Sequence, residues 1–462
     1  MTNLTNRLRL LTYIGLLASL ATPTLAAGAY TELYNFNCAS DGCDPLQPAL
    51  LAQGQDGVLY STLQSGTSNA ADGTIMNYAP GGAESTLYRF QGLDGANPES
   101  GLTLGFDGAF YGTTTLGGAN GKGTVFRLSG SALTVLHDFS DGTDGAYPWA
   151  PPIQTPDGSL YGVTFTGSNP GIAYRIAPNG TFSTIATLPS KTSAPLIMGT
   201  DGNLYGTTQY GGDFNRGTVF RLSTKGKLKI LHSFDPSTEG SVPIGPVMIG
   251  IDDNFYGTTS GGGSASAGIL FQLASSGTYK VLHNFQSATE GNDSMAGLVQ
   301  GSDKFLYGVM SAGGTKGYGT LYRVNIAGTK FQVLHQFDYP TGGYPASTPT
   351  LHTNGTLYGT TTKGGSEENG TSGIIFSFTN GLKPFAALQL WAGKPGASVG
   401  IFGQGFSAAT GVKFGNVAAN YSVVSDTYVV ATVPSGAKTA PVNVSEPGGN
   451  LSTLRKFKVI SH

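Results

Sequence analysis

Three short hydrophobic cassettes recur seven times along the chain, at intervals of about 50 residues. The first reads Leu-Tyr-Gly-Thr-Thr or a close variant, with its tyrosine at positions 60, 111, 161, 205, 256, 307 and 358. The second reads Gly-Thr-Val-Phe-Arg-Leu, and the third reads Val-Leu-His-x-Phe. Each cassette is short and rich in β-branched and aromatic residues, which predicts a β-strand.

A fourth, weaker strand is predicted after each third cassette, as in residues 150–154 and 194–198. It ends at Asp-Gly or a related pair, for example Asp107-Gly108 and Asp157-Gly158. Asp-Gly between two strands is typical of a tight hairpin, because both residues tolerate positive φ. We interpret these aspartates as turn residues instead of catalytic acids or ligands.

Four antiparallel strands per repeat, seven times over, predict an all-β fold, a seven-bladed β-propeller spanning residues 30–381. The chain begins with a third-cassette strand at residues 32–36, and the seventh repeat ends after its second cassette near Phe378. The N-terminal strand is therefore expected to complete the last blade and close the ring.

A different pattern follows at residues 386–460, where short alternating strands are separated by Gly, Pro and Asp-Thr turns. This spacing predicts an immunoglobulin-like β-sandwich.

Charge excludes some classes of partner. The chain has 25 Lys and Arg against 27 Asp and Glu, a net charge of −2. It lacks the basic footprint of a nucleic-acid-binding protein, and the balance gives no reason to expect an anionic membrane as partner. The oligomeric state is left open.

The first 26 residues have the features of a signal peptide. Arg7 and Arg9 precede an apolar run at residues 10–20, and small residues at 22–26 suit cleavage near Ala26. A buried N-terminal helix is the alternative interpretation. No later segment is long and apolar enough for a transmembrane helix. We therefore expect a secreted or cell-envelope protein.

The two cysteines, Cys38 and Cys43, fit an oxidising compartment. They flank a turn-forming tetrad, and we favour a local disulfide over two free thiols.

The C-terminal residues resemble the IPT/TIG domain. The matching motifs are Ile-Phe-Gly-Gln-Gly-Phe at 401–406, Val-Lys-Phe-Gly at 412–415 and Val-Pro at 433–434. The resemblance implies an immunoglobulin-like spacer or binding module of the kind found in cell-surface proteins.

The cassettes between residues 30 and 380 resemble the GloVer tandem-repeat family of exported bacterial proteins of the choice-of-anchor type. Two repeats depart from the pattern, at residues 60–62 and 185–188. The resemblance implies a fold and an exported location, and it supplies no reaction.

Four of the six histidines, at positions 137, 232, 283 and 335, share one position of the third cassette. Such positions diverge around a ring instead of converging on one ion. We therefore expect them to pack between strands, and we expect no metal site and no cofactor.

One face of the propeller is expected to carry the variable loops, which follow the second and fourth strands of each blade. The Asp-Gly turns lie on the other face and are too tight to bind a sizeable ligand. Non-repeated aromatic residues on the loop face are candidates for stacking on sugars, or they pack between blades. The candidate ligand-binding residues are Tyr147, Trp149, Tyr210, Phe214, Tyr318 and Tyr344.

We favour a binding or adhesion module for polysaccharide or a surface protein. A carbohydrate-active hydrolase or lyase is the alternative, and it requires a non-repeated carboxylate pair in the central pit. A purely structural envelope component is the third possibility. No catalytic residue is assigned. The acids expected on the loop face are Asp94, Asp144, Asp213, Glu239, Glu290, Asp338, Glu367 and Glu368.

Overall fold

The computed structural model describes residues 28–38, 41–42, 51–64, 72–166, 170–365 and 372–460. Within these ranges the secondary structure is all β, apart from one 3-10 turn at Phe406–Ala408. No helix in this part of the chain is long and apolar enough to cross a membrane.

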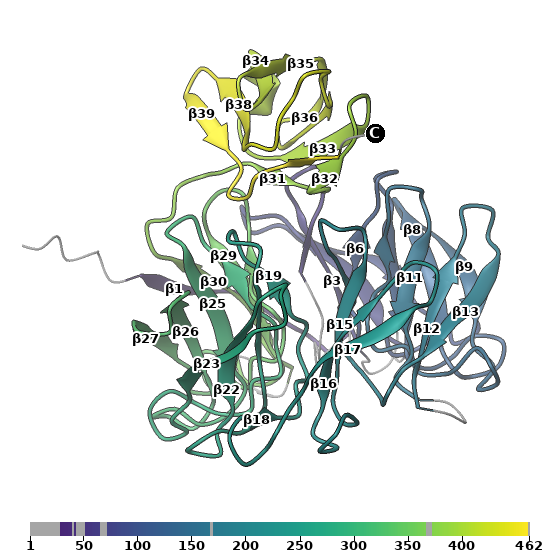
Figure 1. Cartoon of the computed structure of the whole chain (residues 1–462), viewed down its shortest axis with the longest axis vertical. Coiled ribbons are helices and arrows are strands. Elements are labelled where there is room, and N and C mark those ends of the chain that lie inside the picture. The colour runs from purple at the N-terminus through teal and green to yellow at the C-terminus, as the bar shows by residue number, and fades with distance from the viewer. Residues whose placement is uncertain are drawn as a thin grey trace, which may run out of the picture.

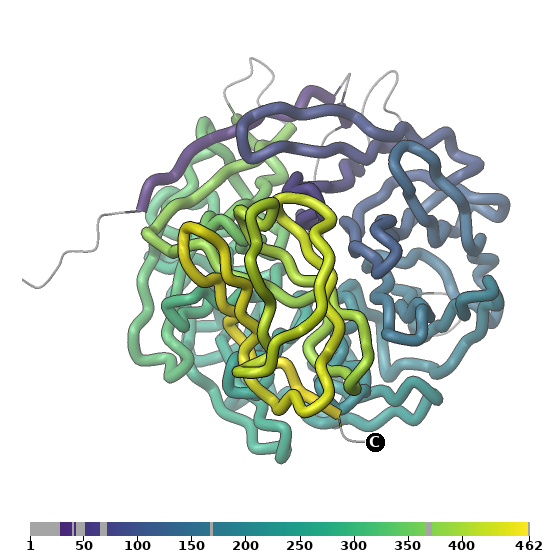
Figure 2. Tube along the Cα trace, turned by 90° about the horizontal axis from the view of Figure 1, so that it is seen from above, coloured from purple at the N-terminus to yellow at the C-terminus, as the bar shows by residue number. Residues whose placement is uncertain are grey.

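The repeats fold into four-stranded antiparallel sheets, seven of them in the described ranges, arranged around a common centre (Figures 1 and 2). In each sheet the strand nearest the centre is a two-residue pairing, followed outward by the first, second and third cassettes. We number the sheets in chain order.

The first three sheets contain β2 (Ala52–Gln53), β3 (Leu59–Leu63), β4 (Thr74–Tyr78) and β5 (Glu84–Arg89); β6 (Thr103–Leu104), β7 (Phe110–Thr114), β8 (Thr124–Ser129) and β9 (Ala132–Asp138); β10 (Ile153–Gln154), β11 (Leu160–Val163), β12 (Ile172–Ile176) and β13 (Phe182–Thr187). The next three contain β14 (Ile197–Met198), β15 (Leu204–Thr208), β16 (Thr218–Leu222) and β17 (Leu228–Ser233); β19 (Met248–Ile249), β20 (Phe255–Thr258), β22 (Ile269–Leu273) and β23 (Tyr279–Asn284); β24 (Val299–Gln300), β25 (Phe305–Met310), β26 (Thr320–Asn325) and β27 (Phe331–Gln336). The seventh contains β28 (Thr350–Leu351), β29 (Leu357–Thr361), β30 (Ile374–Thr379) and β1 (Ala29–Asn35). A two-stranded ribbon, β18 (Gly240–Ser241) with β21 (Gly261–Gly262), lies beside the fifth sheet.

The first and last strands of this region pair with each other. β1 runs antiparallel to β30, from the Ala29–Thr379 pair to the Asn35–Ile374 pair. Neighbouring sheets also share buried apolar clusters, and the seventh sheet shares one with the first through Ile375 and Leu63. Burial of apolar surface between sheet faces is therefore the main force that holds the sheets side by side.

A tyrosine–aspartate pair recurs at the Asp-Gly turns. The first-cassette tyrosine is buried in most sheets, and its hydroxyl donates to the turn aspartate, as from Tyr256 to Asp252 at 2.7 Å and from Tyr205 to Asp201 at 2.8 Å. A buried phenol needs such a partner. The interpretation of these aspartates as structural is confirmed for the pairs seen.

The third-cassette histidines pack against the next sheet, as expected. Their rings stack on an aromatic ring of the following outer strand, in the pairs His137–Phe182, His232–Tyr279, His283–Phe331 and His335–Tyr30. Three of them also contact a carboxylate seven residues later, as Nε2 of His232 contacts Oε2 of Glu239 at 2.8 Å. The position is thus a joint between sheets.

The C-terminal residues form two facing sheets around one core. The first contains β31 (Ala387–Leu388), β33 (Ser398–Phe402), β37 (Tyr428–Thr432) and β36 (Tyr421–Ser425), and the second contains β35 (Val417–Ala419), β34 (Gly411–Phe414), β38 (Val442–Glu446) and β39 (Gly449–Ser452). A parallel pair, β32 (Ala392–Gly393) and β40 (Lys458–Val459), joins the two ends of this region. Val399, Phe406 and Phe457 are fully buried between the sheets.

The sandwich lies on the face of the ring that carries the Asp-Gly turns (Figure 1). Gln389 donates to the carbonyls of Leu104 and Gly105 in the second sheet, at 3.2 and 2.9 Å. Further bonds reach the first, fourth, fifth and seventh sheets, from Thr427 to Gln55 O, Lys458 to Thr200 O, Arg455 to Asp253, and Gln404 to Thr353. The second domain therefore packs on the turn face, where we expected little binding.

Two predictions fall outside the described residues. The signal peptide at residues 1–26 and one partner of the proposed disulfide, Cys43, both lie there, so these expectations stay predictions.

Candidate functional site

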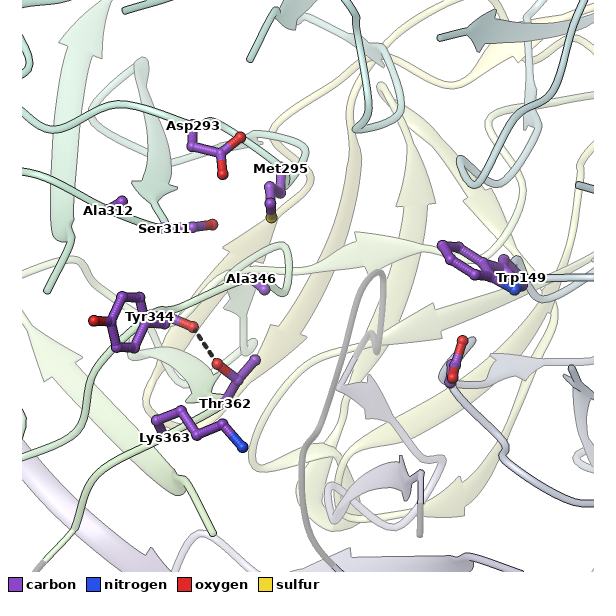
Figure 3. A pocket seen from close by; sticks show the side chains of 10 residues that line it. Trp149, Asp293, Met295, Ser311, Ala312, Tyr344, Ala346, Thr362 and Lys363 are labelled. Carbon is purple, nitrogen blue, oxygen red and sulfur yellow. Dashed lines mark hydrogen bonds between the residues drawn. The ribbon is translucent and has the colours of Figure 1, made fainter. Parts of the chain in front are cut away.

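A cavity of about 590 Å³ opens at the centre of the loop face, opposite the sandwich. This volume lies within the range of about 300–1,000 Å³ typical of small-molecule sites. Its wall is formed by Glu99, Trp149, Asp293, Met295, Ser311, Ala312, Tyr344, Ala346, Thr362 and Lys363 (Figure 3).

Four of these side chains occupy one equivalent position, which we call the lining position. It lies a few residues before the innermost strand of a sheet, and it differs from repeat to repeat. From the second sheet to the seventh it is occupied by Glu99, Trp149, Ser193, Ile244, Met295 and Ala346. A repeated scaffold thus presents a non-repeated set of side chains to the cavity.

The backbone just before the lining position is held in an unusual conformation. The residue two positions earlier has positive φ in five sheets: Asn97 at 55°, Tyr147 at 54°, Val242 at 57°, Asp293 at 60° and Tyr344 at 57°. Positive φ is costly for such residues, and for β-branched valine above all. Backbone bonds hold it on both sides; Tyr344, for example, donates to Tyr318 O at 2.9 Å and accepts from Thr362 N at 3.2 Å. The cavity wall is therefore preorganised.

Glu99 is the most deeply buried ionisable group on this wall, with 7% of its surface exposed. Gln64 Nε2 donates to its Oε1. Among the described residues it forms no ion pair. Burial without a cationic partner raises the pKa of Glu99 to about 7.

Asp293 is a second non-repeated carboxyl on the wall, contributed by the sixth sheet. Burial raises its pKa above the ordinary value for aspartate. Figure 3 shows Asp293 and Met295 on one side of the cavity and Trp149 on the other. Lys363 lies with Thr362 and Tyr344 on the same wall as Asp293.

Trp149 connects the cavity to the rim of the face. Its indole stacks on Phe165, with ring centroids 4.3 Å apart and planes at 7°. The Lys191 ammonium lies 5.0 Å from the Phe165 ring centre and 5.3 Å from that of Tyr210. Phe165 therefore covers one face of the indole, and the Trp149 side chain also borders the cavity.

The six predicted aromatic residues are not gathered into one site. Trp149 and Tyr344 line the cavity. Tyr318 contacts the Tyr344 ring edge-on at 5.6 Å, and Tyr210 lies at the rim beyond Lys191. Tyr147 receives a hydrogen bond from Lys122 at 3.0 Å, and Phe214 is 50% exposed; neither is among the residues of the cavity wall.

The acids expected on the loop face mostly hold the loops in place. Asp144, for instance, accepts from Ser140 N at 2.9 Å and contacts His137, and Asp94, Glu239 and Glu290 act in the same way in other repeats. Asp338 pairs with Lys316 at 2.7 Å, whereas Glu367 and Glu368 lie outside the described residues. None of the described acids in this set lines the cavity; the carboxyls found there are Glu99 and Asp293.

Sequence reasoning therefore missed Glu99, Asp293, Phe165 and Lys191. For Glu99 alone the aligned repeats hold a signal, because the lining position takes six different residue types whereas the residue after it is always Ser, Ala or Gly. In the described part of the chain, no group of three or more His, Cys, Asp or Glu side chains is placed to hold a metal ion.

Comparison with solved structures supports the fold alone. The extracellular domain of a hybrid two-component system from B. thetaiotaomicron is 12% identical, with a TM-score of 0.52 over 82% of this chain and 46% of that chain. This chain therefore spans less than half of that relative. The WD40 β-propeller domain of Doa1 is 9% identical, with a TM-score of 0.49 over 76% of this chain and 97% of that chain. A comparison with curated proteins found no match.

Family models match almost the whole described chain. The IPT/TIG domain model matches residues 386–458, which form the sandwich. The Gloeobacter/Verrucomicrobia repeat model matches residues 19–196 and 191–420. The chain therefore belongs to the Gloeobacter/Verrucomicrobia repeat family and carries a C-terminal IPT/TIG domain.

Proposed function

We propose that this protein is an exported binding module that holds a saccharide, as part of a polysaccharide, in the loop-face cavity. The observation that carries the proposal is the cavity itself, in which a preorganised wall presents non-repeated side chains that include Trp149. Tryptophan suits the apolar face of a sugar ring, and the acid and hydroxyl groups beside it suit the sugar's hydroxyls.

The proposal includes an architecture. The seven four-stranded sheets form a closed seven-bladed propeller over residues 30–381, with β1 as the outer strand of the last blade, and the IPT/TIG domain spans residues 386–460. The β1–β30 ladder and the shared cluster between the seventh and first sheets support closure. Closure without a covalent link would keep the cavity wall in one geometry.

The proposal also includes a location. The N-terminal sequence supports export, with cleavage near Ala26, and Cys38–Cys43 pairing would follow in an oxidising compartment. The sandwich occupies the turn face, so a ligand reaches the centre of the ring from the loop face. A surface protein is the other partner that this arrangement would accommodate.

A second function is favoured by one specific observation. Glu99 and Asp293 are non-repeated carboxyls in the cavity, and the pKa of Glu99 lies near 7, where a general acid works well. A carbohydrate-active hydrolase or lyase would use Glu99 to protonate the leaving oxygen. Release of reducing ends would therefore distinguish this enzyme from a binding module.

The test is a panel of polysaccharides exposed to the purified mature chain, scored for retention and for reducing ends. We expect retention without release, reduced at least tenfold by Trp149→Ala, which corresponds to about 1.4 kcal/mol. Phe106→Ala is the matched control, because Phe106 is an exposed aromatic residue on the turn face.

The remaining outcomes separate the functions. Release of reducing ends that Glu99→Gln abolishes would establish the enzyme. Retention unaffected by Trp149→Ala would move the site away from the cavity. No retention by any member of the panel would overturn the saccharide proposal and leave a protein partner.

A further inference from the structure

The charged groups of the cavity wall are distributed unevenly. Glu99 and Trp149 occupy the lining position of two consecutive sheets, the second and the third, so they are neighbours around the ring. Lys363 belongs to the seventh sheet and lies across the cavity from Trp149 (Figure 3). The Lys191 ammonium lies over the rings of Phe165 and Tyr210 toward the rim.

A carboxyl buried without a cation is costly to ionise. Glu99 is almost fully buried, and its one observed partner is the neutral amide of Gln64. For Asp293, the described residues supply neither an ion pair nor a side-chain hydrogen bond. Some other acids of the loop face have a cationic partner, as Asp338 has in Lys316. Within the described residues, neither cavity carboxyl has one.

An aromatic face next to a carboxylate is the arrangement that proteins use to recognise ammonium groups. The Trp149 indole, which borders the cavity, supplies the first element and Glu99 supplies the second. We propose that the ligand of this cavity is a saccharide that carries a cationic amine, held by Trp149 and Glu99 with Asp293 on the opposite wall. The inference rests on the proposed saccharide-binding function and specifies its ligand class.

Two hexasaccharides that differ only in N-acetylation test this inference. Isothermal titration calorimetry with the glucosamine hexamer and the N-acetylglucosamine hexamer should show at least tenfold tighter binding of the amine form. Glu99→Gln and Asp293→Asn should each weaken the amine form at least tenfold. Glu84→Gln removes one negative charge at an exposed site on an outer strand and should change nothing.

A permanent cation without a sugar ring tests recognition of the ammonium group by itself. Tetramethylammonium does not titrate, so its pH dependence reports on the protein alone. The raised pKa of Glu99 predicts that the affinity for tetramethylammonium rises about tenfold between pH 6 and pH 8 and then levels off, because only the ionised carboxylate attracts the cation. In Glu99→Gln this rise should disappear. Thermal unfolding of each variant checks that it is folded.

The outcomes distinguish the two proposals. Equal binding of both hexamers, lost in Trp149→Ala and kept in Glu99→Gln, would overturn the amine inference and leave the saccharide site. Binding of tetramethylammonium through Glu99 with neither hexamer bound would overturn the saccharide proposal and keep the amine site. If none of the three probes binds, both proposals fall.

Discussion

The two faces of the ring are built from the same repeats and are used in opposite ways. On the turn face the side chains are repeated, as in the Tyr256–Asp252 pair, and the sandwich packs on this face. On the loop face the lining position differs in every described sheet, and the centre is an open cavity. Repetition therefore marks residues that serve the scaffold, and variation at a fixed position marks residues available for a ligand.

This comparison predicts that changes at repeated positions lower stability and leave ligand binding alone. The largest effect is expected for Phe271→Ala, because Phe271 is fully buried between the fourth and fifth sheets. Loss of a buried phenyl ring costs about 3–5 kcal/mol. Thermal and denaturant unfolding would measure the loss, and folded Phe271→Ala protein should still bind. A stable variant that no longer binds would show that this buried position also serves the ligand.

At the lining position we predict the opposite result, in which a substitution raises stability and weakens ligand binding. The pKa of Glu99 is raised from 4.5 to about 7 in the folded chain, so folding favours its protonated form. Its contribution is intact below pH 4.5 and is lost as the pH rises through 7. Glu99→Gln should therefore stabilise the protein by about 1–3 kcal/mol at pH 8, have little effect at pH 4.5, and weaken binding of the amine-bearing saccharide at least tenfold. Unfolding curves at both pH values measure this, and equal stability at pH 8 would contradict it.

A buried histidine should give a pH effect of opposite sign. Burial lowers the pKa of His335 to about 4, and its ring stacks on Tyr30 of β1 at 3.7 Å. The unfolded chain takes up a proton near pH 6.5 and the folded chain near pH 4, so stability falls as the pH drops from 6.5 to 4. His335→Phe should lose less stability over this window than the natural chain. The melting temperatures of both proteins, measured from pH 7 to pH 4, check this. If the two fell by the same amount, the prediction would be wrong.

Removing one repeated hydroxyl should have a moderate effect. The Tyr256 hydroxyl donates to Asp252 and accepts from Gln272, each at 2.7 Å. Tyr256→Phe leaves both partners without it, at a cost of about 1–2 kcal/mol. Chemical denaturation measures the change, and binding of the saccharide should be unaltered. A gain in stability would show that the pair does not support the turn.

The smallest effect is expected where the sandwich meets the ring. Arg455 pairs with Asp253 at 2.8 Å, and the Asp253 side chain is 74% exposed. Exposed pairs contribute less than about 1 kcal/mol and weaken with salt. Arg455→Ala should lower the melting temperature slightly at low salt and not at high salt. A large, salt-independent loss would instead show that Arg455 acts through its packing on Trp391.

The sequence was sufficient to predict the all-β, propeller-like fold because a repeated residue type reports a repeated environment. The tyrosine of the first cassette recurs in all seven repeats, and Asp-Gly at the turn and histidine in the third cassette each recur in four of them, so each environment could be interpreted several times. The IPT/TIG domain was predictable for a related reason, since its Gly and Pro turns set the strand spacing.

The cavity could be predicted only in part. Trp149 and Tyr344 were identified as unusual aromatic residues, but nothing in the sequence shows that they and Asp293, in different repeats, face one space. Glu99 resembles any loop acid until its burial is known. The face on which the sandwich packs could not be predicted either, because its contacts use ordinary polar groups such as Gln389 and backbone carbonyls.

The claim that the loop-face cavity binds the ligand can be tested with tryptophan fluorescence. The chain has two tryptophans, Trp149 in the cavity wall and Trp391 in the sandwich. In Trp391→Phe, Trp149 is the sole reporter, and we predict a saturable change in its emission on titration with an oligosaccharide that the natural chain retains. Trp149→Phe, which reports from Trp391, should show none. A saturable signal from Trp391 with a silent Trp149 would contradict the account.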